Sequence, residues 1–132
     1  MSSFTDELII EPTEDSTKWK LVQPFRYWIQ ELHKGPVITV PAGFVTDFAS
    51  IPQMFWSVLP PWGKYGKAAV VHDYLYQTAL CPRDECDEVF LEAMEVLGVP
   101  YITRKTMYYA VRMFGQIAWD NHRKNDKKEE TK

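Results

Sequence analysis

The stretch Lys64–Gly98, KYGKAAVVHDYLYQTALCPRDECDEVFLEAMEVLG, contains two helical patterns with a short break between them. The first pattern covers about 64–80 and ends at Cys81-Pro82, since proline cannot continue a helix. The second covers about 83–97; it begins with acidic residues, which suit the positive end of a helix dipole, and ends at a glycine. Because the break is short, the two helices are predicted to lie antiparallel.

Strand patterns precede this stretch. Apolar residues alternate with polar ones from Trp19 to Ile29, as in a half-buried strand, and Pro24 places that strand at an edge or a bulge. The sequence VITVPAGFVTDF at 37–48 predicts a further pair of strands, interrupted at 41–43. We therefore expect a small antiparallel sheet before the helices.

A third helix and two polar ends complete the predicted fold. Residues 103–123 carry apolar side chains at helical spacing. The fold class is therefore α+β: a small N-terminal antiparallel sheet followed by three α-helices, the first two antiparallel. We expect a polar N-terminal arm at 1–17, a single α+β domain at 18–121 and a disordered charged tail at 122–132. The apolar, proline-rich loop between sheet and helices is predicted to hold one helical turn at 52–58.

Composition places the chain among soluble globular proteins. Of 132 residues, 45% are apolar and 14% aromatic, which suits one domain with a modest core. The net charge of −3 argues against a nucleic-acid partner, which usually meets a basic face. No apolar run is long enough for a transmembrane segment and no signal-peptide pattern opens the sequence, so we expect a cytoplasmic protein. Cys81 and Cys86 fit reduced thiols better than a disulfide, because nothing indicates an oxidising compartment.

An adjacent His and Asp interrupt the apolar run of the first helix. His72 and Tyr76 lie one turn apart on one face, whereas Asp73 is rotated by about 100°. The returning helix can bring Asp87, or else Asp84, back to the face of His72. A carboxylate there would fix the tautomer of the imidazole and raise its basicity, as in a water-activating dyad. The alternative is a structural network that only joins the two helices.

Asp73 and Asp47 are the candidate metal ligands. Asp73 can hold a hard cation such as Ca²⁺ or Mg²⁺ together with backbone oxygens and water. Asp47 follows a strand and has two hydroxyl residues close in the sequence, Thr46 and Ser50, so its carboxylate can join Asp73 at the same ion. The alternative for Asp47 is that it accepts hydrogen bonds from the amides of its own turn.

Three motifs give the chain a resemblance to a known family. VPAGFVTDFASIPQMFW, LPPWGKYGKAAVVHDYLY and PRDECDEVFLEAMEVLGV occur in this order, and together they resemble the domain-of-unknown-function family 1353 over residues 19–118. The resemblance implies an origin in tailed bacteriophages or prophages. It implies no particular activity, because the family has none established.

A second resemblance concerns the chemistry of the paired helices. HDYLY and CDEVFLEAM are similar to the helices of calcium-dependent secreted phospholipases that carry His-Asp-x-Cys-Tyr and Cys-Asp motifs. The resemblance implies that His72 is the general base for water, that Asp87 orients it and that Tyr76 donates a hydrogen bond to Asp87. It also implies calcium at Asp73. The glycine- and cysteine-rich calcium loop and the disulfides of those enzymes are absent from this sequence, so Asp47 and loop carbonyls would have to substitute.

Two functional hypotheses follow from these features. The first is a phage-encoded, metal-assisted hydrolase that acts on a cell-envelope component through a His/Asp dyad, with Ca²⁺ or another divalent cation as cofactor. The second is a non-enzymatic virion or assembly protein, in which the His-Asp-Tyr network is structural and the apolar loop at 51–62 docks on phage virion or tail proteins. Both place synthesis in the host cytoplasm, and the second adds assembly into the virion.

Overall fold

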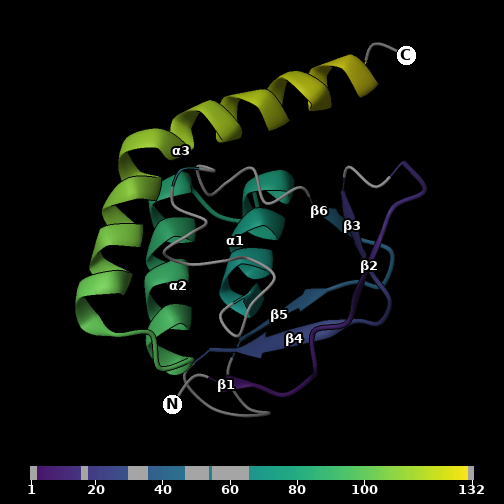
Figure 1. Cartoon of the computed structure of the whole chain (residues 1–132). Helices are drawn as coiled ribbons and strands as arrows, with labels where there is room; N and C mark the ends of the chain where they lie inside the picture. Colours follow the sequence, from purple (N-terminus) through teal and green to yellow (C-terminus); the bar gives the residue numbers. More distant parts are fainter. Residues whose placement is uncertain (1–2, 16–17, 30–35, 47–53, 55–65, 131–132) are drawn as a thin grey trace.

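The strands and the helices occupy two sides of the molecule (Figure 1). A computed structural model of the chain describes residues 3–15, 18–29, 36–46, 54 and 66–130, with the backbone alone for 127–130. Within these ranges short strands come first and α-helices follow, so the predicted α+β class is confirmed. The strands are β1 (Ser3–Phe4), β2 (Ile10–Pro12), β3 (Trp19–Leu21), β4 (Phe25–Trp28), β5 (Val37–Val40) and β6 (Val45–Thr46), and the helices are α1 (Gly66–Thr78), α2 (Arg83–Val96) and α3 (Tyr101–Glu130).

The strands form two antiparallel sheets of three strands each, in the orders β1-β4-β5 and β2-β3-β6. The single strand predicted over 19–29 is therefore wrong. The chain bends before Pro24, whose nitrogen carries no hydrogen for a ladder bond, and β3 and β4 enter different sheets. The predicted alternation nevertheless identifies core residues correctly, because Leu21, Phe25 and Tyr27 are all buried.

The described residues of the polar arm predicted at 1–17 contribute two strands to the sheets. β1 pairs with β4, and β2 pairs with β3. The arm holds its place through apolar contacts, since the ring of Phe4 stacks on Phe25 at 5.5 Å between centroids and lies 4.6 Å from the ring of Tyr27. The few apolar residues of the arm therefore attach it to the sheets, although most of its residues are polar.

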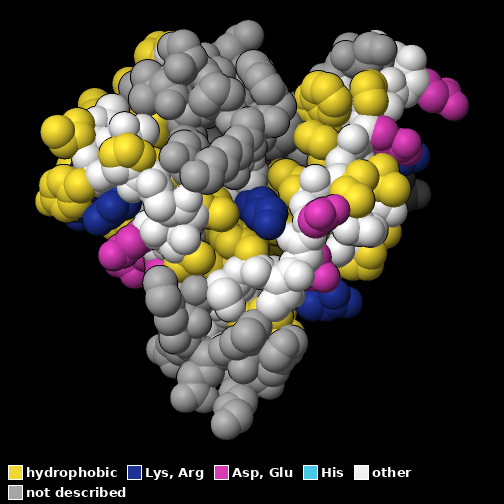
Figure 2. Space-filling view, turned by 60° about the horizontal axis from the view of Figure 1, so that its bottom comes forward, with side chains coloured by type: hydrophobic (Ala, Val, Ile, Leu, Met, Phe, Trp, Pro, Cys, Tyr) yellow, Lys and Arg dark blue, Asp and Glu magenta, His cyan; other side chains and the backbone are white. Residues whose placement is uncertain are grey.

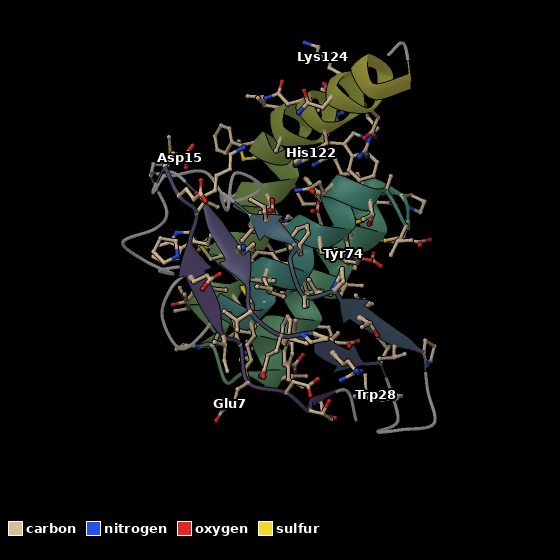
Figure 3. The ribbon with its side chains drawn as sticks, turned by 90° about the vertical axis from the view of Figure 1, so that its right-hand side faces the viewer. Glu7, Asp15, Trp28, Tyr74, His122 and Lys124 are labelled. Carbon is tan, nitrogen blue, oxygen red and sulfur yellow. The ribbon has the colours of Figure 1, made fainter. Side chains whose placement is uncertain are left out.

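The helix pair agrees with the prediction. α1 and α2 lie side by side and run in opposite directions through the short connection at 79–82 (Figure 1). α1 also packs on α3 and on the strands β5 and β6, so it occupies the centre of the fold. On the sheet side, the rings of Phe44 and Tyr74 meet edge to face at 5.3 Å between centroids, and Figure 3 shows Tyr74 on α1 next to the strands.

α3 is longer than the predicted helix at 103–123. It runs to Glu130 and so includes most of the segment 122–132 that the sequence analysis assigns to a disordered tail. Arg123 gives a physical reason, because its Nη2 donates hydrogen bonds to the carbonyl oxygens of Tyr76 and Gln77 at the end of α1, at 2.9 and 2.8 Å. These bonds satisfy carbonyls that a helix end leaves without partners. The helical turn predicted at 52–58 lies outside the described residues, except for Met54.

Candidate functional site

A hydrogen-bonded group of His72, Tyr76 and Asp87 lies between α1 and α2. His72 Nε2 is 2.7 Å from Asp87 Oδ1, and the Tyr76 hydroxyl donates to the same oxygen at 2.6 Å. All three side chains are fully buried. The predicted approach of Asp87 to the His72–Tyr76 face is therefore confirmed as geometry, and Asp84 is exposed at the start of α2.

Two arginines bind the other oxygen of Asp87. Arg112 of α3 donates from Nη1 to Asp87 Oδ2 at 2.8 Å, and Arg83 of α2 approaches the same oxygen at 3.4 Å. Arg83 also donates to the carbonyl oxygens of Val111 and Arg112 at 3.0 and 3.2 Å. Asp87 thus joins all three helices, and its buried charge is balanced by two cations, as a buried carboxylate requires.

The protonation states of this group follow from its partners. Burial by itself would raise the pKa of Asp87, but the hydrogen bonds from His72, Tyr76 and Arg112 hold that pKa below its usual range. An ionised carboxylate only accepts hydrogen bonds, so Nε2 of His72 must carry the proton of their shared bond. Burial and the bond to Asp87 raise the pKa of Tyr76, which therefore stays a hydroxyl and a donor.

The second nitrogen of His72 is the chemically distinctive atom. Nδ1 is buried and has no hydrogen-bond partner in the part of the chain that the structure describes. The ring is held by its neighbours, at 4.2 Å from the ring of Tyr76 and 4.6 Å from that of Phe90 between centroids. With Nε2 protonated, a neutral ring has its lone pair on Nδ1, so the arrangement can accept a proton there.

Asp73 faces a different part of the molecule. It is fully buried, and its Oδ2 accepts a hydrogen bond of 2.5 Å from the hydroxyl of Thr46 in β6. The predicted divergence of Asp73 from the His72 face is therefore observed. Asp47 and Ser50 lie outside the described residues, and within the described ranges no three His, Cys, Asp or Glu side chains are grouped as a metal ion would need. The metal role of Asp73 and Asp47 stays a prediction.

Comparison with known proteins identifies the family. The model of the family "Protein of unknown function (DUF1353)" matches residues 19–111, which is most of the chain. The chain belongs to this family. An uncharacterized protein of Sinorhizobium fredii (strain NBRC 101917 / NGR234), y4jT, is 42% identical over 78 residues, which cover 58% of this chain and 23% of that relative. No solved structure matches the chain.

Two residues of the site lie just beyond the segment that the family model matches, and the sequence analysis missed both. Arg112 sits on the third helix, far in sequence from Asp87, so no local spacing indicates the pair. Gly115 had a usable signal, because a glycine inside a helix costs about 1 kcal/mol and often marks close packing. A Cβ at Gly115 would lie 2.5 Å from the Tyr76 hydroxyl oxygen and 3.1 Å from Arg83 Nη1.

Cys81 precedes α2, and Cys86 lies near the N-terminus of that helix. Cys81 Sγ and Cys86 Sγ are 3.0 Å apart and are not joined by a disulfide in the structure, and the reduced pair stays a prediction. Burial is the main cause that raises the pKa of each thiol. A raised pKa lowers the fraction of thiolate, which is the nucleophilic form of cysteine, at neutral pH.

Proposed function

We propose that this protein is a hydrolase in which His72 activates a water molecule and Asp87 orients His72. The observation that carries the proposal is that the two nitrogens of the His72 imidazole have different surroundings. Nε2 is bound by a carboxylate that three further donors hold in place, whereas Nδ1 is left without a partner among the described residues. In a histidine that acts as a general base, a carboxylate orients the ring through one nitrogen and the other nitrogen accepts the proton.

The proposed reaction is ordinary ester or amide cleavage. Nδ1 takes a proton from water while the water oxygen bonds to the carbonyl carbon, and Asp87 stabilises the imidazolium that forms. The same proton then passes to the leaving oxygen or nitrogen as its bond to the carbon breaks. General-base assistance of this kind contributes about 10²–10⁴-fold in rate.

The proposal also includes the class of substrate and a divalent cation. The resemblance to phage proteins favours a cell-envelope target, either a lipid ester or a peptidoglycan component, and a phage-encoded protein made in the host cytoplasm. A divalent cation at Asp73 and Asp47 would supply the positive charge that stabilises an oxyanion. Asp73, held by Thr46, is the one of these two carboxylates that lies in a described part of the chain.

The direct test compares hydrolysis by the wild-type chain and His72→Ala on phospholipid vesicles, short aryl esters and purified peptidoglycan. We expect His72→Ala to lose at least about 10²-fold in rate. His122→Ala, which changes the other histidine of the described ranges outside this site, is the control and should keep the wild-type rate. Equal rates for His72→Ala and wild type on every substrate would reject the proposal.

Calcium is tested separately by calorimetric titration of Ca²⁺, Mg²⁺ and Zn²⁺ into wild type and Asp73→Asn. The metal-assisted form of the proposal expects saturable binding of a hard cation that Asp73→Asn weakens. Heat that is the same for both proteins, or no heat at all, would remove the cation from the mechanism and leave the dyad to be judged by hydrolysis.

The complete burial of His72, Tyr76 and Asp87 favours a second candidate function. In this alternative the network only stabilises the three-helix packing of a non-enzymatic virion or assembly protein. Its predicted docking loop at 51–62 lies outside the described residues, apart from Met54. Mass spectrometry of purified particles would favour this candidate if the chain appears at a fixed copy number, and His72→Ala would then lower stability with no activity to lose.

A further inference from the structure

The outer face of α3 carries a row of exposed apolar side chains. Ile102, Tyr109, Met113 and Ile117 are 78%, 60%, 72% and 69% exposed. Their spacing of seven, four and four residues places them on one side of the helix, so we call them the α3 outer stripe. The stripe spans about 23 Å along the axis at 1.5 Å per residue. Figure 2 shows hydrophobic side chains gathered at the left-hand edge of the molecule, where α3 lies in Figure 1.

Positive charge outweighs negative charge on α3. Between Tyr101 and Trp119 the sequence has Arg104, Lys105 and Arg112 and no Asp or Glu, but Arg112 is paired with Asp87, and the exposed Asp120 lies one turn beyond Ile117. The whole chain divides in the same way. Residues 1–100 hold seven Lys and Arg against fourteen Asp and Glu, whereas residues 101–132 hold eight against four. A protein of net charge −3 therefore concentrates its positive charge on the helix that exposes the apolar row.

The excess of positive charge on α3 indicates which kind of partner can bind the stripe. A second copy of the chain that paired α3 to α3 would bring together two segments that each carry an excess of Lys and Arg, eight against four Asp and Glu in residues 101–132. An anionic surface is complementary instead. The stripe stands on the convex side of a helix, opposite the buried Met107 and Val111, so it suits a flat partner better than a narrow groove.

We propose that the α3 outer stripe binds the surface of an anionic lipid bilayer. Amphipathic helices with a basic flank lie in the plane of such a surface, with the apolar side chains about 5–10 Å into the boundary between headgroups and acyl chains. None of the described helices has the length and the apolar character to cross a bilayer, so contact is with the surface alone.

The residues have distinct parts in this contact. Ile102, Met113 and Ile117 enter the apolar boundary, and Tyr109 places its hydroxyl among the headgroups, as aromatic rings do at membrane interfaces. Lys105, whose ammonium lies 5.7 Å from the ring centroid of Tyr101, faces the lipid phosphates. Figure 3 shows Lys124 projecting outward from the C-terminal half of α3, which extends the cationic contact along the helix.

The surface does not depend on the proposed hydrolysis, and the inference holds whether or not His72 activates water. It orients the molecule with α3 toward the lipid and the acidic remainder of the chain away from it. Membrane association would therefore weaken as salt concentration rises, because screening acts on the charge contribution.

Vesicle flotation with the full chain tests the inference. Two vesicle preparations are compared at low ionic strength, phosphatidylcholine with phosphatidylglycerol in equal parts and phosphatidylcholine alone. We expect the chain to float with the anionic vesicles and not with the neutral ones. The triple variant Ile102→Ser, Met113→Ser, Ile117→Ser should bind at least about tenfold more weakly, and Lys105→Gln about fivefold more weakly.

The control is a matched triple variant with the same number of exposed apolar residues changed elsewhere, Val22→Ser, Val37→Ser and Leu80→Ser. It should bind as wild type does, and circular dichroism should show all variants folded because the changed side chains are exposed. Four results would overturn the inference: no flotation with anionic vesicles, equal flotation with neutral ones, a dimer in sedimentation that the stripe variant dissociates, or capture of an acidic protein without any lipid binding.

Discussion

Asp87 and Asp73 are both fully buried aspartates at the centre of the molecule, but the groups that hold them differ. Asp87 accepts hydrogen bonds from an imidazole, a phenol and two guanidinium groups of three helices. One of the groups that bind Asp73 is the neutral hydroxyl of Thr46, a residue of the sheet. The comparison separates two uses of a buried carboxylate. The imidazole and two guanidinium groups fix Asp87 as the group that orients His72, whereas the bond between Asp73 and Thr46 joins α1 to the sheet.

The largest effect is expected for Asp87→Ala. The substitution leaves the buried donors of His72, Tyr76 and Arg112 without their acceptor, and breaking a buried charged pair from one side costs about 3–5 kcal/mol. Urea unfolding measures the change in free energy. Asp84→Ala, at the exposed start of the same helix, is the control and should cost about 0.3–1 kcal/mol through the helix dipole. Similar losses for the two variants would contradict the assigned role of Asp87.

Gly115→Ala tests how closely α3 must approach the Asp87 group. The new Cβ would overlap the hydroxyl of Tyr76, so the side chain or the helix must shift, at a cost of about 1–3 kcal/mol. Without the overlap the same substitution would stabilise a helix by about 1 kcal/mol. Thermal and urea unfolding of Gly115→Ala give the sign directly.

The matched control for this prediction is a double-mutant cycle with Tyr76→Phe, which removes the overlapping oxygen. Gly115→Ala should cost less in the Tyr76→Phe background, with a coupling of at least about 0.5 kcal/mol. Additive effects of the two substitutions would show that the hydroxyl is not what limits the approach of α3.

Thr46→Val tests how much the hydrogen bond to Asp73 contributes to stability. The variant keeps the shape of the side chain and removes one donor to Asp73, so we expect a loss of about 1–3 kcal/mol in the free energy of unfolding. Thr39→Val, at an exposed position of β5, should stay within about 0.5 kcal/mol of wild type. A loss as large as that of Asp87→Ala would mean that the two aspartates are held with equal strength, against the difference described above.

The helical half of the fold was predictable because its signals are local. A proline between two periodic segments and a terminal glycine define the α1–α2 pair, and the His72–Asp87 contact follows from that pairing. The sheets were less predictable, since pairing of β1 with β4 and of β2 with β3 depends on contacts between distant residues. Arg112 escaped detection for the same reason, because only the packing of α3 brings it to Asp87.

The smallest effect, and the most specific, is the acid dependence of stability. The pKa of Asp87 is lower in the folded protein than its value of about 3.9 in an unfolded chain, so the stabilising contribution is complete above that value. The contribution declines as pH falls through the folded pKa, by at most about 1.4 kcal/mol per pH unit for one proton. Urea unfolding between neutral and strongly acidic pH should therefore show wild type approaching the stability of Asp87→Asn as pH falls. An advantage of wild type that is constant or grows toward acid would contradict an ionised Asp87 in the folded protein and, with it, the assignment of the Nε2 proton to His72.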